Sequence, residues 1–215
     1  MKTPVTSYKL KQHLTYSWWK YLLIAVAAFG LVDLLYSVTA YRPPRDKTVS
    51  LYAYGYIDES ALTEYMDTVR ETEMSDMEEL SYVTLVSDDT YGPMQLMTYM
   101  AVGEGDVYLL PREEFLNNAS NGSLTPLEND PELMSLFDSA GISLQSGWRS
   151  EKDTGETHLY GIPQDKLPGL SRYVYAKDGF LCMNITGRNQ DNARKFLRIL
   201  CRDTLTPPAA PQDSE

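Results

Sequence analysis

An N-terminal transmembrane helix followed by a three-layer α/β domain with a mostly parallel sheet is the fold class that the sequence predicts. Three observations lead to it. Residues 21–41 form a nearly unbroken apolar run, strand-like and helix-like segments alternate from 49 to 110, and an amphipathic helix over 191–202 closes the domain. Strands separated by helices of this length favour parallel pairing, right-handed crossovers and helices on both faces of the sheet.

The apolar run from Tyr21 to Tyr41 can span a bilayer as a helix. About 20 residues rising 1.5 Å each match a hydrocarbon core of roughly 30 Å. Four lysines and no acidic residue precede the run: Lys2, Lys9, Lys11 and Lys20. The positive-inside bias then places residues 1–20 in the cytoplasm and the C-terminal domain outside the cell. We therefore expect a single-pass protein of the cell membrane.

Two interpretations of this run stay open. Val38-Thr39-Ala40 has the small residues that signal peptidase reads, so the segment could be a cleaved signal peptide. An uncleaved signal anchor is favoured, because the run exceeds the usual apolar region of about 7 to 15 residues and Trp18-Trp19 resembles an interfacial anchor.

Asp33 is the acidic residue inside the span. A carboxyl group at that depth costs about 2.5 kcal/mol or more unless it is protonated, paired or near water. It is either a contact with a membrane-protein partner or an acid that a very apolar helix tolerates.

Charge separates the two parts of the chain and excludes one class of partner. The 215 residues carry a net charge of -11, and without the four lysines and Asp33 the remainder holds 15 basic and 29 acidic residues. Nucleic acid is excluded as a partner, because binding a polyanion requires clustered Lys and Arg. A surface this acidic also stays away from anionic lipid.

The outer domain is expected at residues 49–204, between a stiff linker at 42–48 and a disordered tail at 205–215, both rich in proline. Alternation predicts a strand from Val49, and Asp58 or Ser60 can cap the helix that follows. The apolar run 82–87 predicts a second strand, and Gly92-Pro93 starts a helix with its methionines and Ala101 turned inward. The run 107–110 predicts a third strand.

The second half of the domain alternates similarly. Short helices are expected after Pro111 and Pro131, closed by Gly122 and Gly141, followed by a polar hairpin or excursion at 143–157. Strands are expected at 158–162 and 180–185. The last helix, 191–202, repeats apolar residues at helical spacing.

Three segments resemble the extracellular solute-binding proteins of bacterial ABC importers. MQLMTYMAVGEGDVYLLPREEFLNNASNGSLTPLEN at 94–129 is similar to the first-lobe segment of that family. Residues 159–165 (LYGIPQD) resemble the segment where the family's chain re-enters the sheet, and 192–200 (NARKFLRIL) resemble a lobe helix. The resemblance covers roughly 49–202 and implies one lobe of the type II periplasmic-binding-protein fold on a membrane anchor.

Two departures limit what the resemblance implies. Family members are usually about twice as long, and here a short link at 165–179 stands where a second lobe would be inserted. There is also no lipoprotein cysteine near the anchor. Capture of a ligand by closure of two lobes is therefore in doubt.

Candidate binding residues follow the predicted strands, because ligands of open α/β sheets gather at the carboxyl ends of strands. Aromatic rings could stack on a sugar or peptide, acids could hydrogen-bond hydroxyl groups, and an arginine could hold an acid. The alternative is that such residues only end strands and cap helices. The candidates are Tyr54, Tyr56, Asp88, Asp89, Tyr91, Arg112 and Gln164.

No catalytic or metal-binding set stands out. His158 is the one histidine of the outer domain, and its strand-like surroundings favour a hydrogen-bonded structural role. No zinc-ligand spacing, calcium loop, Walker loop or GxGxxG motif occurs. Cys182 and Cys201 could form a disulfide outside the cell, or remain two buried thiols.

Two functions follow as hypotheses. The first is a non-enzymatic, membrane-anchored module that resembles a solute-binding protein and either binds a small solute (a sugar, peptide or amino acid) or serves as accessory subunit of a transporter. The second is a structural or assembly protein whose outer lobe and membrane helix dock on another membrane protein, with Asp33 at the helix contact.

Overall fold

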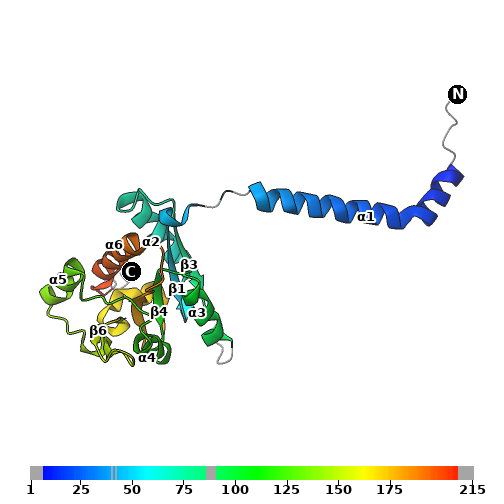
Figure 1. Cartoon of the computed structure of the whole chain (residues 1–215). Coiled ribbons are helices and arrows are strands. Elements are labelled where there is room, and N and C mark those ends of the chain that lie inside the picture. Colours follow the sequence, from blue (N-terminus) through cyan, green and yellow to red (C-terminus); the bar gives the residue numbers. More distant parts are fainter. Residues whose placement is uncertain (1–6, 40, 42, 86–90, 208–215) are drawn as a thin grey trace, which may run out of the picture. The chain divides into compact units, whose positions relative to one another are not determined.

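A computed structural model of the chain describes residues 7–39, 41, 43–85 and 91–207 (Figure 1). The chain divides into two compact units, Met1–Arg42 and Pro43–Glu215. Each unit is described by itself below.

The described residues of the first unit form helix α1, from Ser7 to Thr39, apart from Tyr41. Its segment Trp18–Thr39 has 22 residues with a mean hydropathy of 2.1, which is long and apolar enough to cross a membrane. Asp33 lies within this segment. The helix therefore agrees in length and composition with the predicted span.

A five-stranded sheet organises the second unit. Its strands are β1 (Thr48–Ala53), β3 (Glu79–Thr84), β4 (Val107–Leu110), β7 (Ile162–Pro163) and β9 (Phe180–Met183), in the order β3-β1-β4-β9-β7. β1 pairs in parallel with β3 and β4, whereas β9 runs antiparallel to both β4 and β7. The predicted mostly parallel α/β sheet is confirmed.

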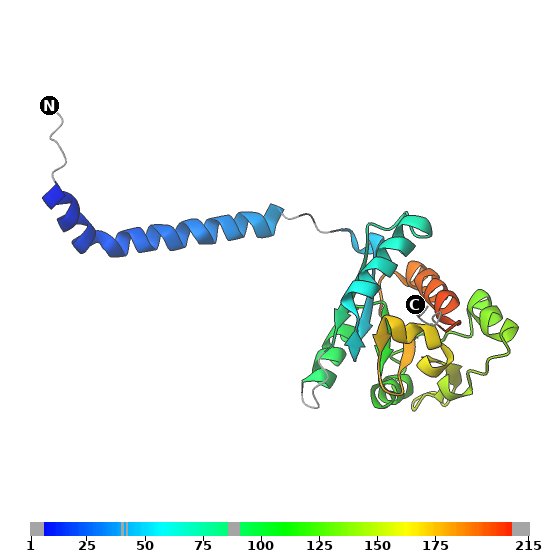
Figure 2. The ribbon, with the colours of Figure 1, turned by 180° about the vertical axis from the view of Figure 1, so that it is seen from behind.

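Helices cover both faces of this sheet, as predicted (Figures 1 and 2). The helices are α2 (Glu59–Thr72), α3 (Gly92–Ala101), α4 (Arg112–Ser120), α5 (Pro131–Ser139) and α6 (Gln190–Thr204). Alternate strand residues belong to two separate cores. Leu51 packs in the core that α2, α5 and α6 complete, and its neighbour Tyr52 packs in the core that α3 and α4 complete. β4 and β9 are buried at every position, so they bury both of their faces, which explains their unbroken apolar character.

Local signals in the sequence set several element boundaries. The side chain of Asp58 accepts a hydrogen bond from the backbone N–H of Ala61 (3.0 Å), which caps α2. Asp130 caps α5 in the same way through Leu133 (3.1 Å). Both predicted helix-closing glycines have positive φ, 66° at Gly122 and 65° at Gly141.

Two small antiparallel ribbons complete the domain. β2 (Tyr56–Ile57) pairs with β8 (Val174–Tyr175), and β5 (Trp148–Ser150) pairs with β6 (Thr157–Leu159) as the hairpin expected near 143–157. The segment 165–179, predicted as a short link, is folded. It contains the 3₁₀ turn Pro168–Arg172 and strand β8, and it buries Leu167, Leu170 and Val174.

Three predictions of elements were wrong in detail. The second strand begins at Glu79 and not at Tyr82, with Glu79 paired to Thr48 at the start of β1, and it ends at Thr84; residues 86 and 87 of the predicted run lie outside the described residues. The strand expected at 158–162 divides between β6 and β7. On α3, Met94 and Met97 are 67% and 74% exposed and Ala101 is exposed as well, whereas Leu96 and Met100 are buried.

The two cysteines are free and buried. Of the two alternatives, a disulfide or two buried thiols, the structure has the buried thiols. Cys182 lies in the core on the α3 and α4 side of the sheet, and Cys201 lies in the core on the α2 and α6 side. A layer of backbone separates the two thiols, which excludes the short Cβ to Cβ distance of a disulfide. Burial raises the pKa of both thiols and keeps them protonated.

A cluster of three tyrosines fixes the turn before β4. The rings of Tyr52 and Tyr99, and those of Tyr52 and Tyr108, have centroids 5.2 Å apart. Gly105 fits beside them with a φ of 73°, where an added Cβ would lie 2.6 Å from the Tyr108 hydroxyl. This position requires glycine for its backbone and for its lack of a side chain.

Candidate functional site

The carboxyl ends of β1, β3, β4 and β7 lie at one edge of the sheet because these four strands run in the same direction. We call this the strand-end edge and define it by residues 54–57, 91, 111–112 and 174–176. The backbone N–H of Tyr54 donates to the carbonyl of Leu109 (2.9 Å), which holds the chain leaving β1 beside the end of β4. Loops of different strands therefore converge here, as the sequence predicts.

An exposed aromatic pair lies at the strand-end edge. Tyr56 lies directly opposite Tyr175 in the ribbon of β2 and β8. Their side chains are 67% and 52% exposed. Gly55 allows the approach of β8, because an added Cβ would lie 2.3 Å from the carbonyl oxygen of Tyr175. Opposite side chains in such a ribbon are near enough to form one stacking surface.

Tyr54 and Tyr91 have different environments. Tyr54 is half-buried and packs against the core on the α3 side, so it offers less surface than Tyr56. Tyr91 precedes α3 at its N-cap position and is 70% exposed. Asp88 and Asp89 lie outside the described residues.

Arg112 is exposed at the first residue of α4 and lies near a second guanidinium, that of Arg149. Burial, and next the charge of Arg112, lower the pKa of Arg149. Arg149 is held over the ring of Phe115 at 5.7 Å from its centroid. Two neighbouring guanidinium groups favour a carboxylate or another anion at this end of β4.

Gln164 is a structural residue, which corrects its prediction as a binding residue. Its amide nitrogen donates to the carbonyl of Val174 (2.9 Å), and its amide oxygen accepts from the N–H of Ala176 (3.0 Å). The side chain is buried. Gln164 therefore supports β8 from behind and holds Tyr175 at the edge instead of facing a ligand.

Tyr175 and Arg149 were not predicted. The run Tyr173-Val174-Tyr175 is typical of a strand, but the sequence places it in a segment interpreted as a link. Arg149 comes near Arg112 through the packing of β5 on α4, which no local pattern indicates.

His158 is hydrogen-bonded in the role predicted for it. Its Nδ1 lies 2.6 Å from a carboxylate oxygen of Glu128, whose other oxygen accepts from the N–H of Leu159 (3.0 Å). The hydrogen bond to Glu128 raises the pKa of His158. Within the described residues, no three His, Cys, Asp or Glu side chains gather as a metal site would require.

Two hollows flank helix α2. One has a volume of about 610 Å³ and lies between α2 and Tyr82 of β3. The other, of about 230 Å³, lies between α2 and residues Arg172 and Tyr173. The ring of Tyr173 stacks there on that of Tyr65 of α2, with centroids 4.7 Å apart. The sequence predicted neither hollow.

No protein-family model matches the sequence, and no curated protein matches it. Among solved structures, an extracellular solute-binding protein family 1 member from Alicyclobacillus acidocaldarius is 21% identical with a TM-score of 0.41. The match covers 57% of this chain and 28% of the chain of that protein. The N-glycan transport solute binding protein NgtS of Streptococcus pneumoniae is 15% identical with a TM-score of 0.39, over 54% of this chain and 24% of its own.

A TRAP periplasmic solute binding protein from Desulfovibrio salexigens is 10% identical with a TM-score of 0.30, over 74% of this chain and 75% of its own. The match thus spans about a quarter of the first two proteins. All three are described as solute-binding proteins, the group that the sequence resembles.

Proposed function

We propose that the chain is a membrane-anchored, non-enzymatic binding module and that the strand-end edge is its binding surface. The observation that carries this proposal is the exposed pair of Tyr56 and Tyr175 at the edge where four strands end. Aromatic faces stack on sugar rings and on peptide side chains, and Arg112 beside Arg149 adds a contact for an acidic group.

The edge is open, and this openness sets the affinity to expect. A pocket that holds a small solute tightly buries most of its surface. A single lobe contacts one side of a sugar or peptide, so we expect weak binding by this chain alone and tighter binding when a transporter subunit covers the other side. An accessory subunit of a transporter therefore fits the edge better than a free solute carrier.

The experiment is a binding screen of the full chain in nanodiscs of neutral lipid. Thermal shift against sugars, peptides and amino acids should identify a ligand, and calorimetry should then compare Tyr56→Ala and Arg112→Ala with the control Met97→Ala. Loss of binding in the first two variants alone supports the strand-end edge. Equal binding by all three variants would place the ligand elsewhere, and flat shifts throughout would remove solute binding.

A second function, docking on another membrane protein, is favoured by the exposed face of α3. Residues 91–103 contain no charged side chain in a strongly acidic domain. Met94 and Met97 are 67% and 74% exposed, and Tyr91 at the N-cap of the helix is 70% exposed. Methionine and tyrosine are enriched at the centres of interfaces and charged residues are depleted there.

A detergent pull-down of the full chain distinguishes the two functions. Met97→Glu should release a stoichiometric membrane partner if α3 docks, whereas Tyr56→Ala should not. Asp33→Leu tests the helix contact separately. Recovery of the partner unaffected by Asp33→Leu would remove Asp33 from the interface and leave α3 as the contact.

A further inference from the structure

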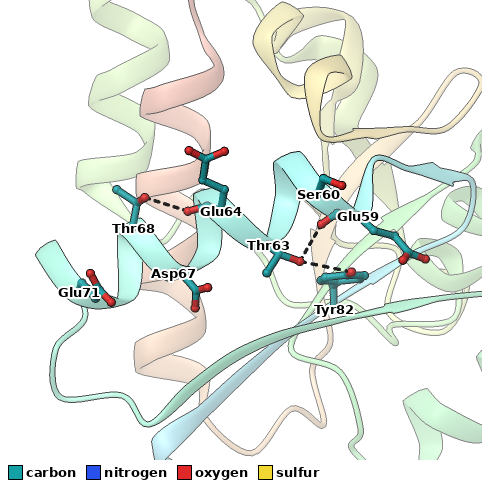
Figure 3. A pocket seen from close by; sticks show the side chains of 8 residues that line it. All are labelled: Glu59, Ser60, Thr63, Glu64, Asp67, Thr68, Glu71 and Tyr82. Carbon is teal, nitrogen blue, oxygen red and sulfur yellow. Dashed lines mark hydrogen bonds between the residues drawn. The ribbon is translucent and has the colours of Figure 1, made fainter.

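β3 is an edge strand, and the larger hollow beside α2 lies along it. The sheet order places β3 at one end, with β1 as its partner. Four carboxylates and the phenol of Tyr82 line the hollow, with three hydroxyl side chains between them (Figure 3). The complete lining is Glu59, Ser60, Thr63, Glu64, Asp67, Thr68, Glu71 and Tyr82.

Alternate residues of β3 present their backbone groups to the open side of the sheet. The N–H of Leu85 donates to the carbonyl of Ala53 (2.8 Å), which the register pairs with Thr84. Because the direction of these groups alternates along a strand, the N–H and C=O groups of Leu80, Tyr82 and Thr84 point away from β1. No described backbone group apart from those of β1 bonds to β3.

Tyr82 joins this open edge to the acidic flank of α2. The hydroxyl of Thr63 donates to its phenol oxygen (3.5 Å), a contact drawn as a dashed line in Figure 3. Its backbone groups point to the open side, where an added strand would lie about 4.8 Å away. Side chains of an added strand on the α2 face would therefore meet Glu64, Asp67 and Glu71.

The charge of this flank is poorly balanced. α2 carries four acidic residues and one basic residue, Arg70. The Arg70 guanidinium lies 3.7 Å from Asp67 and 3.6 Å from Glu71, which are both exposed contacts. Glu59 and Glu64 have no ion pair among the described residues. The flank therefore suits a cationic partner.

We propose that β3 and α2 form a docking site for an extended, cationic peptide segment of a partner protein, which adds a strand to the sheet and places Lys or Arg side chains against α2. Main-chain hydrogen bonds supply affinity in such additions, and alternate side chains supply specificity. A second copy of this chain is a poor occupant, because edge-to-edge pairing would bring two acidic α2 flanks together.

The test uses the full chain in nanodiscs of neutral lipid and a fluorescent heptapeptide of alternating Lys and Val. We expect saturable binding by anisotropy that weakens as salt rises. Two control peptides separate the contributions: the Glu-for-Lys version should not bind, and a version N-methylated at alternate residues should bind about tenfold more weakly, since it cannot form the ladder.

Variants of the protein test the site itself. Thr84→Pro removes an outward N–H without loss of a bond to β1, so the sheet remains folded and peptide affinity should fall about tenfold, whereas Thr84→Val should bind normally. The triple variant Glu64→Gln, Asp67→Asn, Glu71→Gln should lose binding. The matched triple Glu113→Gln, Asp138→Asn, Asp153→Asn carries the same charge change elsewhere and should retain it.

Three results would overturn the proposal. They are equal binding of the N-methylated and unmethylated peptides, equal weakening in both triple variants, and dimerisation of the chain that Thr84→Pro abolishes. The first two would reduce the effect to general attraction by an acidic domain, and the third would assign the edge to a second copy. Circular dichroism of each variant confirms that it is folded.

Discussion

Tyr56 lies directly opposite Tyr175, although the two residues are far apart in the sequence. One follows the first strand of the sheet, and the other belongs to the folded segment between β7 and β9. Their pairing makes the strand-end edge a product of both halves of the domain. A ligand on this edge would contact both halves at once.

The aromatic pair should contribute to binding and little to stability. Tyr56→Ala and Tyr175→Ala each remove an exposed ring, so the free energy of unfolding should change by less than about 1 kcal/mol. Each should weaken a ligand found in the binding screen by about five- to tenfold, the value of one stacking contact. Urea unfolding and calorimetry on the same samples measure both quantities. A large loss of stability would show that the ribbon, and not the rings, accounts for weaker binding.

Gln164 should be essential for stability despite its polar side chain. Gln164→Leu leaves the carbonyl of Val174 and the N–H of Ala176 without partners in a buried site. We expect the free energy of unfolding to fall by about 2 to 4 kcal/mol. Gln145→Leu changes an exposed residue in the same way and should alter stability by less than about 0.5 kcal/mol. Similar losses of stability in Gln164→Leu and Gln145→Leu would contradict the structural role of Gln164 in supporting β8.

Gly105 and Gly155 offer a matched pair of glycine substitutions. Both have positive φ, 73° and 71°, but an added Cβ at Gly105 meets two tyrosine rings and at Gly155 meets nothing within 4 Å. Gly155→Ala should cost about 1 kcal/mol of backbone strain, and Gly105→Ala should cost about 1 to 3 kcal/mol more through overpacking. Thermal unfolding of both variants measures the difference. An equal loss of stability in the two variants would mean that the tyrosine rings move aside for the added methyl group without a measurable penalty.

His158 makes the stability of the domain depend on pH. The hydrogen bond to Glu128 raises its pKa above the ordinary value of 6.5. The folded state therefore holds the proton more tightly than the unfolded state, so the contribution is fully present below 6.5 and is lost as pH rises through the folded pKa. Glu128→Gln should flatten this part of the stability profile in urea unfolding between about pH 5.5 and 8.5. If Glu128→Gln leaves the slope of stability against pH unchanged, the pair of His158 and Glu128 is not the source of that slope.

Reducing agents should not affect the domain. Titration of unfolded, unreduced protein should give two reactive thiols per chain, and the native protein should react slowly because both cysteines are buried. Dithiothreitol should leave the melting temperature unchanged. If the unfolded, unreduced protein had no reactive thiols, Cys182 and Cys201 would be bonded to each other. That would require the two cores to rearrange, since the sheet separates the two residues.

Local physics accounts for what the sequence predicts well. Asp58 and Asp130 are cap residues that act within one turn, and the run Val107–Leu110 is buried on both faces, so both signals can be seen in a few neighbouring residues. The inward face of α3 was mispredicted for the opposite reason. Its apolar residues surround the helix, and periodicity alone does not say which side meets the sheet.

The features of the candidate site also divide into those that neighbouring residues indicate and those that depend on how distant segments pack. The sequence indicates the strand-end edge, because parallel strands share a direction, and it indicates Tyr56 and Arg112, which lie beside strand ends. It does not indicate that Gln164 turns inward or that Tyr175 faces Tyr56, since both depend on how residues 165–179 fold back. The hollow on α2 lies along β3, and which strand forms the edge of the sheet is a property of strand order.

The position of β9 in the sheet constrains the order in which the domain can fold during synthesis. β9 lies between β4 and β7 and bonds to both, so β7 can join the sheet only after residues 180–183 have been synthesised. The pairing of Val107 with Met183 closes a long loop, which slows folding relative to local contacts. A nascent chain that stalls before this strand would leave one edge of β4 without a partner strand, because β1 covers only the other edge. Such fragments should be substrates for quality-control proteases, and a truncation ending before residue 180 should accumulate poorly in cells.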